Sequence, residues 1–325
     1  MGGITLITGG AGYIGMLVAE ELLAASREVR VLDSLLHGQQ GCADALRDQG
    51  VELVVADVRD TDARAEALRG VDAVVHLAAI VGDPACARDE PTAHAVNVVA
   101  AMALIEDAAA AGVDRFVFAS TCSNYGRMAD PLVPVTEDGV LAPVSLYAEQ
   151  KVAVEQALLG LSPAPFAATC IRFATVYGLA PRMRFDLTVN EFTRDLWSGR
   201  RLEVFGEQFW RPYVHVRDAA RGVRAVLEAP VEVVAGEVFN VGDTAENYRK
   251  LDLVELIRRE TDRGEVAFVA RAEDPRDYKV SFAKVAERLD YAITSTVPEG
   301  VREIIGALEE ERFADAFDGR YRNIA

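Results

Sequence analysis

The chain has 325 residues, of which 50% are apolar and 26% charged, so it can form a sizeable core as one large domain or two small ones. Its formal net charge of -17 would repel nucleic acid and anionic lipid, which we therefore do not expect as partners. We find no window with the ~20 apolar residues of a membrane span and no N-terminal signal-peptide pattern. The four cysteines show no paired or metal-ligand spacing. These observations predict a reduced, cytoplasmic protein without a structural metal.

The first half of the chain alternates short apolar runs with amphipathic stretches. The expected strands are 4–8, 28–32, 51–56, 73–77, 115–119 and 167–172, and the expected helices are 15–25, 91–111 and 145–159. Strands that alternate with helices predict a parallel sheet covered on both faces. The fold class predicted is therefore α/β, with a Rossmann-type doubly wound parallel sheet.

After Gly178 the alternation loosens. Helices are expected at 187–198, 219–227, 251–261 and 295–310, and short strands at 201–205, 213–216 and 238–241. This mixture predicts a smaller α+β C-terminal substrate lobe laid against the sheet, and the chain at about 216–241 should rejoin the first domain.

A glycine-rich turn follows the first expected strand and opens the first helix. It reads TGGAGYIG over residues 8–15 and has the spaced glycines Gly9, Gly12 and Gly15. Without a Cβ the backbone can turn sharply and approach a pyrophosphate, and the helix N-terminus then offers free N–H groups to the phosphates. The strand-turn-helix context predicts that this turn, with Tyr13 and Ile14, binds a dinucleotide.

The ends of the next strands supply further residues for a dinucleotide. Asp33 closes the second strand, where a carboxylate can accept hydrogen bonds from ribose hydroxyls and would repel a 2′-phosphate, so it favours NAD over NADP. Five more residues are expected to line the cofactor, namely Asp57 and Val58 at the adenine ring, and Leu77, Ala78 and Ala79 beside the dinucleotide. Small residues such as these are equally expected in any tight turn between a strand and a helix.

Tyr147 and Lys151 form the expected catalytic pair. They are four residues apart at the start of a predicted helix, so both side chains lie on one face. The phenol has a reference pKa of ~10, which a neighbouring ammonium and a cationic nicotinamide would lower. Tyr147 could then exchange a proton with a substrate hydroxyl while hydride moves to or from the cofactor.

Taken together, these motifs resemble the extended short-chain dehydrogenase/reductases, the group of nucleotide-sugar epimerases and dehydratases. The resemblance extends over nearly the whole chain and rests on TGGAGYIG, Asp33, HLAA at 76–79, Asn97, STCSNYG at 120–126, YAEQK at 147–151, IRFATVYG at 171–178, RPYVHVRD at 211–218 and NVGD at 240–243. It implies an NAD-binding Rossmann domain at 1–178, a mainly nucleotide-sugar-binding lobe at 179–325, a nucleotide-sugar substrate and a homodimer.

The resemblance also implies individual roles. Thr121 would hydrogen-bond the reacting sugar oxygen, Tyr147 would be the acid/base, and Lys151 would hold the nicotinamide ribose. Arg211 and Arg276 match arginines that bind the diphosphate of the nucleotide sugar, a role that suits the planar guanidinium. Asn97 is expected in the cofactor site, and Ser123 and Asn190 in the substrate site.

Two positions depart from the family pattern. The 4,6-dehydratases carry Asp-Glu directly after the catalytic threonine, where this chain has Cys122 and Ser123. Many members have Phe-Asn where this chain has Ala174 and Thr175. Cys122 is either a small buried residue or a second acid/base, since a thiol of reference pKa ~8.5 needs only modest tuning for that role.

The sequence favours an NAD-dependent epimerase, most simply one that inverts C4 through a transient 4-keto sugar. A dehydratase or a keto-sugar reductase on the same scaffold is the alternative, with Cys122 as a second acid/base. The missing Asp-Glu pair argues against the common dehydratases, and Asp33 argues against a reductase that consumes NADPH. A non-catalytic dinucleotide sensor is disfavoured because Thr121, Tyr147 and Lys151 are all present.

Overall fold

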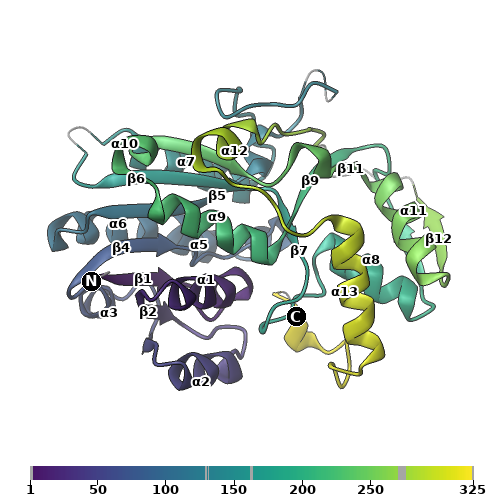
Figure 1. Ribbon diagram of the computed structural model, residues 1–325, viewed down its shortest axis with the longest axis horizontal. Coiled ribbons are helices and arrows are strands. Elements are labelled where there is room, and N and C mark those ends of the chain that lie inside the picture. Colours follow the sequence, from purple (N-terminus) through teal and green to yellow (C-terminus); the bar gives the residue numbers. More distant parts are fainter. Residues whose placement is uncertain (1–2, 129, 131, 162–163, 270–275, 324–325) are drawn as a thin grey trace.

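The computed structural model describes residues 3–128, 130, 132–161, 164–269 and 276–323. Its centre is a seven-stranded parallel sheet in the order β10-β6-β5-β4-β1-β2-β3 (Figure 1). The strands are β1 (Ile4–Thr8), β2 (Glu28–Asp33), β3 (Glu52–Val55), β4 (Val71–His76), β5 (Arg115–Thr121), β6 (Ala167–Phe173) and β10 (Glu237–Val241). This order confirms the predicted Rossmann-type sheet.

Helices cover both faces of this sheet. One face carries α1 (Tyr13–Ala24), α2 (Gln40–Asp48), α9 (Val216–Glu228), α10 (Val231–Val234) and α12 (Ala283–Leu289). The other carries α3 (Thr61–Ala67), α4 (Asp83–Arg88), α5 (Glu90–His94), η1 (Ala95–Ala100), α6 (Ala101–Ala111) and α7 (Leu146–Leu159). Strand residues such as Leu6, Val31 and Val74 are fully buried between these layers, as expected of a parallel sheet.

The single helix predicted at 91–111 is in fact three consecutive segments. Between α5 and α6 the chain forms the π turn η1, which carries Asn97. The stretch Glu90–Ala111 is also the one helix of the described chain long and apolar enough to cross a membrane, contrary to our expectation of no such window. Because 44% of its most apolar window is buried, and Leu104 and Ile105 pack under the sheet, we interpret it as a core helix of this domain.

Most of the remaining elements after β6 form a smaller α+β lobe, which agrees with the predicted fold class. Its strands are β7 (Thr175–Tyr177), β8 (Arg201–Val204), β9 (Trp210–His215), β11 (Asn247–Arg249) and β12 (Glu265–Phe268), and its helices are α8 (Thr188–Trp197), α11 (Lys250–Thr261) and α13 (Val297–Glu309). They form two small sheets, β11-β9-β7 and β12-β8, around a separate apolar core. Short 3₁₀ turns are η2 (Cys122–Tyr125), η3 (Thr244–Glu246) and η4 (Gly319–Tyr321).

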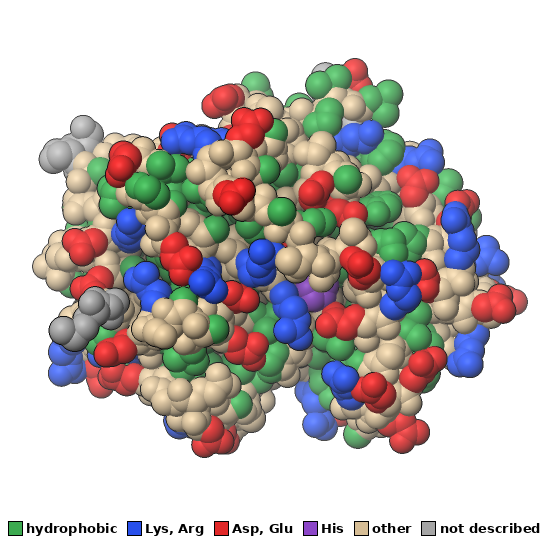
Figure 2. Space-filling view, viewed as in Figure 1, with side chains coloured by type: hydrophobic (Ala, Val, Ile, Leu, Met, Phe, Trp, Pro, Cys, Tyr) green, Lys and Arg blue, Asp and Glu red, His purple; other side chains and the backbone are tan. Residues whose placement is uncertain are grey.

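The lobe lies beside the carboxyl ends of the central strands, and the chain crosses between the two parts more than once (Figure 1). Helix α9 packs against α1, and β10 pairs with β6 at the sheet edge. The surface is hollowed between the two parts, at the lower edge of the view in Figure 2. This arrangement leaves the carboxyl ends of the parallel strands facing a cleft, where ligands bind in sheets of this kind.

Candidate active site

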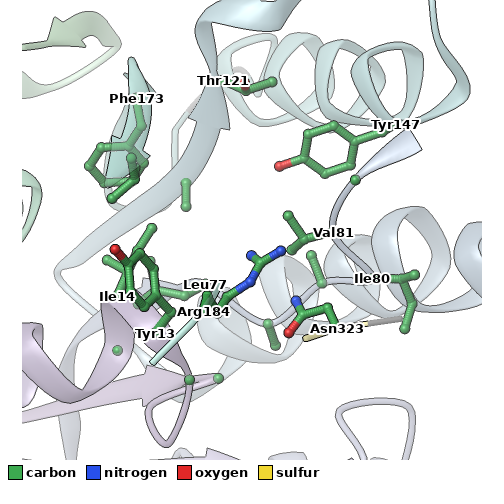
Figure 3. A pocket seen from close by; sticks show the side chains of 18 of the residues that line it. Tyr13, Ile14, Leu77, Ile80, Val81, Thr121, Tyr147, Phe173, Arg184 and Asn323 are labelled. Atoms are coloured by element: carbon green, nitrogen blue, oxygen red, sulfur yellow. The ribbon is translucent and has the colours of Figure 1, made fainter. Parts of the chain in front are cut away.

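A cavity of about 800 Å³ lies at the carboxyl ends of the central strands, between the sheet and the lobe (Figure 3). Most residues predicted for the site line it: Gly9, Gly12, Tyr13, Ile14, Gly15, Asp33, Asp57, Val58, Leu77, Ala78, Ala79, Thr121, Ser123, Tyr147, Lys151, Arg211 and Arg276. Asn97, Cys122 and Asn190 do not line it. The tertiary structure therefore brings together residues from opposite ends of the chain, and their individual roles remain predictions.

The glycine-rich turn has the shape that a diphosphate needs. Gly9 has a φ of +74°, and a Cβ there would lie 2.8 Å from the backbone nitrogen of Ala78. A Cβ on Gly15 would lie 2.3 Å from the carbonyl oxygen of Gly9, so the helix could not sit so close to the turn. Gly12 caps α1 without any side chain, which leaves the first N–H groups of the helix free to face an anion.

Asp33 stabilises this turn by hydrogen bonds, and it lines the cavity. Its Oδ2 accepts a hydrogen bond from the Ala11 N–H at 3.0 Å, and its Oδ1 accepts one from the Leu35 N–H at 2.8 Å. Burial raises the pKa of Asp33, and the two backbone hydrogen bonds oppose the rise. A carboxylate fixed beside a diphosphate-shaped turn fits the ribose of a dinucleotide.

Asn97 lies behind the residues that line the cavity and hydrogen-bonds one of them. Its Oδ1 accepts from the Ile80 N–H at 2.7 Å, and its Nδ2 donates to the Ile80 carbonyl at 3.0 Å and to Gln150 Oε1 at 2.8 Å. Asn97 lies on the π turn η1. Through these hydrogen bonds its side chain connects the loop after β4 to α7. Asn97 therefore does not line the cavity and its amide is hydrogen-bonded within the protein, while its predicted contact with the cofactor stays a prediction.

Tyr147 and Lys151 project from the first turns of α7. Figure 3 shows the Tyr147 hydroxyl pointing into the cavity, with Thr121 at the end of β5 nearby. The Lys151 ammonium donates to the Ala119 carbonyl at 2.8 Å and lies 5.9 Å from the centre of the Tyr147 ring. Burial lowers the pKa of Lys151 to about 8 and raises that of Tyr147, and nearby Cys86 and Asp83 raise the latter further.

A buried ion pair holds α7 against the strands beneath the site. Arg172 on β6 makes a two-pronged contact with Glu155, one helical turn beyond Lys151. Glu155 also accepts from Ser120 Oγ at 2.6 Å, next to Thr121 on β5. Breaking a buried pair by removing one partner is strongly destabilising, so this contact holds Tyr147 and Lys151 in position relative to the end of β5.

Arg211 and Arg276 meet in the cavity although they lie 65 positions apart in the sequence. Arg211 donates to the Arg276 carbonyl, and its guanidinium lies 5.3 Å from the centre of the Tyr278 ring. The Arg276 guanidinium pairs with Asp83 at 2.9 Å and donates to Ser123 Oγ at 3.2 Å. Two arginines that line the same cavity suit a diphosphate.

Cys122 and Asn190 are buried and do not line the cavity, which favours the packing alternative for Cys122 and leaves Asn190 without the predicted place in the substrate site. The Cys122 thiol donates to the Arg172 carbonyl at 3.3 Å, and burial raises its pKa, so the position is that of a packing residue. Asn190 is 0% exposed, accepts from the Gly178 N–H at 2.9 Å and donates to the Arg184 carbonyl at 2.8 Å. Its amide thus shapes the segment after β7 and is not available to a substrate.

Sequence reasoning missed many residues that line the cavity, and three polar ones are Asp83, Arg184 and Asn323. The Oδ1 of Asp83 is buried and has no hydrogen-bond partner within the described ranges. The Arg184 guanidinium lies in the middle of the cavity and pairs with Asp186 at 2.8 Å. Asn323 is contributed by the far end of the chain. The only signal for Arg184 was its place in the irregular segment after Gly178. Nothing local marks Asp83 or Asn323, because only the fold brings them to the cavity.

The parallel sheet, the glycine turn and the Tyr147–Lys151 pair together define a dinucleotide-binding enzyme of the Rossmann class. The sequence matches the NAD dependent epimerase/dehydratase family over residues 5–242. The chain belongs to this family and is an NAD-dependent enzyme.

Similar proteins fall within the same group. A UDP-glucose 4-epimerase from Streptomyces lividans is 30% identical over 312 residues, which cover 90% of this chain and 92% of that protein. The structure of a Thermus thermophilus UDP-glucose 4-epimerase with NAD superimposes with a TM-score of 0.82 at 26% identity, covering 94% of this chain and 99% of the other. A dTDP-glucose 4,6-dehydratase from Streptomyces venezuelae, with NAD bound, has a TM-score of 0.82 at 27% identity and covers 95% and 98%.

Proposed function

We propose that the chain inverts C4 of a nucleotide-activated sugar, with Tyr147 as the acid/base. The observation that carries the proposal is the cavity itself, which brings the Tyr147 hydroxyl and Thr121 together with Arg211 and Arg276. A nucleotide sugar has matching groups, because it carries both sugar hydroxyls and a diphosphate. The similarity to UDP-glucose 4-epimerases supports the same substrate class.

Proton transfer would be the task of this chain's own side chains. NAD, when bound, supplies a hydride acceptor that can return the hydride to the sugar. Tyr147 would take the proton from the C4 hydroxyl as the keto group forms and return it when the hydroxyl is restored on the other face. Thr121 would hydrogen-bond the same oxygen. No net electrons or protons leave the site, so the cycle is redox-neutral.

The charges around Tyr147 bear on this role. Burial raises the pKa of the phenol, which by itself would make Tyr147 a poor proton acceptor. The buried Lys151 ammonium, 5.9 Å from the ring centre, favours the tyrosinate because an opposite charge stabilises the ionised form. Lys151 is therefore expected to be needed for proton transfer as well as for ribose binding.

Dehydration is a second candidate, and one observation favours it. Loss of water from a keto sugar needs an acid/base at a second carbon, and Cys122 is turned away from the cavity. Asp83, in contrast, lines the cavity, and its Oδ1 has no hydrogen-bond partner among the described residues. A carboxylate there could remove a proton from a neighbouring carbon once the keto sugar has formed.

Product analysis with a panel of nucleotide sugars separates these functions. The purified chain, with NAD, would be incubated with UDP-, dTDP-, GDP- and CDP-linked hexoses, and products would be identified by NMR. We expect one pair of C4 epimers to interconvert to equilibrium without net absorbance change from NADH. A product lighter by one water would favour dehydration with Asp83, and consumption of NADH or NADPH in step with product would establish a reductase.

We also propose that two copies of the chain pair through the helices that cover one face of the sheet, the stretch Glu90–Ala111 and α7. Val99 on this stretch is 56% exposed, so its side chain is accessible to a second copy. We expect light scattering to give twice the chain mass of 35.2 kDa. Val99→Arg should yield monomers, whereas Val231→Arg, at an exposed valine of α10, should not. A monomeric wild-type chain would contradict the proposal.

A further inference from the structure

The segment that follows α13 returns from the lobe to the rim of the cavity. Three contacts hold its last described residues. The Phe185 N–H donates to the Tyr321 carbonyl at 2.8 Å, Arg182 Nη2 donates to the Arg322 carbonyl at 3.1 Å, and the Asn323 N–H donates to Asp186 Oδ2 at 3.0 Å. All three partners belong to the irregular segment after β7, so the contacts join two parts of the chain far apart in sequence.

An aromatic cluster secures the same segment. The rings of Phe185, Phe313 and Tyr321 pack edge to face in all three pairs, with centroids 5.0 to 5.8 Å apart. Phe185 is fully buried and belongs to a small apolar core with Met183. Residues 310–323 are therefore docked by packing as well as by backbone hydrogen bonds, and their position at the rim is built into the fold.

The side chain of Asn323 projects from this docked segment into the cavity. Figure 3 shows its amide beside the Arg184 guanidinium, on the side of the loop that carries Ile80 and Val81. Its Oδ1 is fully covered and has no hydrogen-bond partner in the described parts of the chain. A buried polar atom without a partner is unfavourable, and because Asn323 lines the cavity, a bound ligand could supply the partner once the amide turns toward it.

We propose that Asn323 is a ligand-binding residue whose amide hydrogen-bonds a hydroxyl group of a bound glycosyl or ribosyl ring. A hydroxyl can both donate to Oδ1 and accept from Nδ2, which a phosphate oxygen cannot do. Such hydroxyls are present on NAD and on a nucleotide sugar. The nucleotide-sugar source rests on the function proposed above, whereas the NAD source does not.

Replacing Asn323 tests this role without detaching the segment, because its anchor to Asp186 is the backbone N–H. We would compare Asn323→Ala and the nearly isosteric Asn323→Leu with wild type. The affinity for NAD would be measured by calorimetry, and the affinity for the nucleotide sugar that the chain turns over would be measured separately, with UDP-glucose as the first probe. Arg322→Ala is the matched control, since its exposed side chain lies on the same segment.

Loss of one hydrogen bond should weaken binding by about 2- to 10-fold. Weaker NAD binding alone assigns the hydroxyl to the dinucleotide, and weaker nucleotide-sugar binding alone assigns it to the substrate. Both affinities unchanged in Asn323→Ala and Asn323→Leu would overturn the proposal. An equal loss of affinity in Arg322→Ala would also overturn it. A fall in the melting temperature of the ligand-free Asn323 variants large enough to explain the lost affinity would have the same consequence. If the nucleotide-sugar panel yielded no substrate, the proposed epimerase function would fail, but the measurement of NAD affinity would still test the role of Asn323.

Discussion

Tyr147→Phe should lower kcat by ~10²- to 10⁴-fold, the usual contribution of general acid–base catalysis. The substitution removes only the hydroxyl that points into the cavity and leaves the ring over which Lys151 lies. Because the proposed cycle begins when this hydroxyl takes a proton from the sugar, the chemical step should fail while ligands still bind. Steady-state kinetics with the substrate found in the panel, together with NAD affinity, would measure both effects.

Tyr291→Phe is a matched control for this experiment. This substitution also removes a buried phenol hydroxyl, which donates to the Asp218 carbonyl at 2.9 Å. Tyr291, however, does not line the cavity. We expect Tyr291→Phe to keep kcat and to lose at most a little stability, about 1 kcal/mol for one hydrogen bond. If Tyr147→Phe kept near wild-type kcat as well, Tyr147 would not be the acid/base.

Gly9→Ala should weaken NAD binding by ~10- to 100-fold. The new Cβ would meet the backbone nitrogen of Ala78 at 2.8 Å, at a residue whose φ is +74°. Overpacking of this kind typically costs about 1–3 kcal/mol, and each 1.4 kcal/mol is about tenfold in affinity. The turn must shift away from β4 to relieve the contact, and its N–H groups would then no longer converge on the diphosphate. Calorimetric titration of the variant with NAD would test this.

Gly70→Ala separates steric contact from backbone strain. Gly70 has a nearly identical φ of +68°, but a Cβ there would meet nothing within 4 Å. The control should therefore lower the melting temperature through strain alone and keep its NAD affinity. Equal loss of affinity in the two variants would mean that the effect is general destabilisation, and the close approach of Gly9 to Ala78 would then not explain cofactor binding.

The sequence by itself determined the elements and residues whose chemistry is local. Continuous apolar runs are typical of the strands of a parallel sheet, so the strands from β1 to β6 could be predicted from their own residues. The glycine turn, Asp33, and the Tyr147–Lys151 pair depend on spacings of a few residues, and all of them line the cavity as expected. The short α2, α3, α10 and β12 were missed because their stability comes from tertiary packing, which local pattern does not report.

Only the tertiary structure decided which way the remaining side chains point and what they meet. Cys122 follows Thr121 directly, yet the 3₁₀ turn η2 aims its thiol at Arg172 and away from the cavity. Asn190 lies on a helix near the site, but its amide is used by Gly178 and Arg184. Arg276 and Asn323 reach the cavity through contacts with residues more than 100 positions away, such as Ser123 and Asp186. Such long-range partners are chosen by the packing of whole elements, so no local pattern in the sequence could specify them.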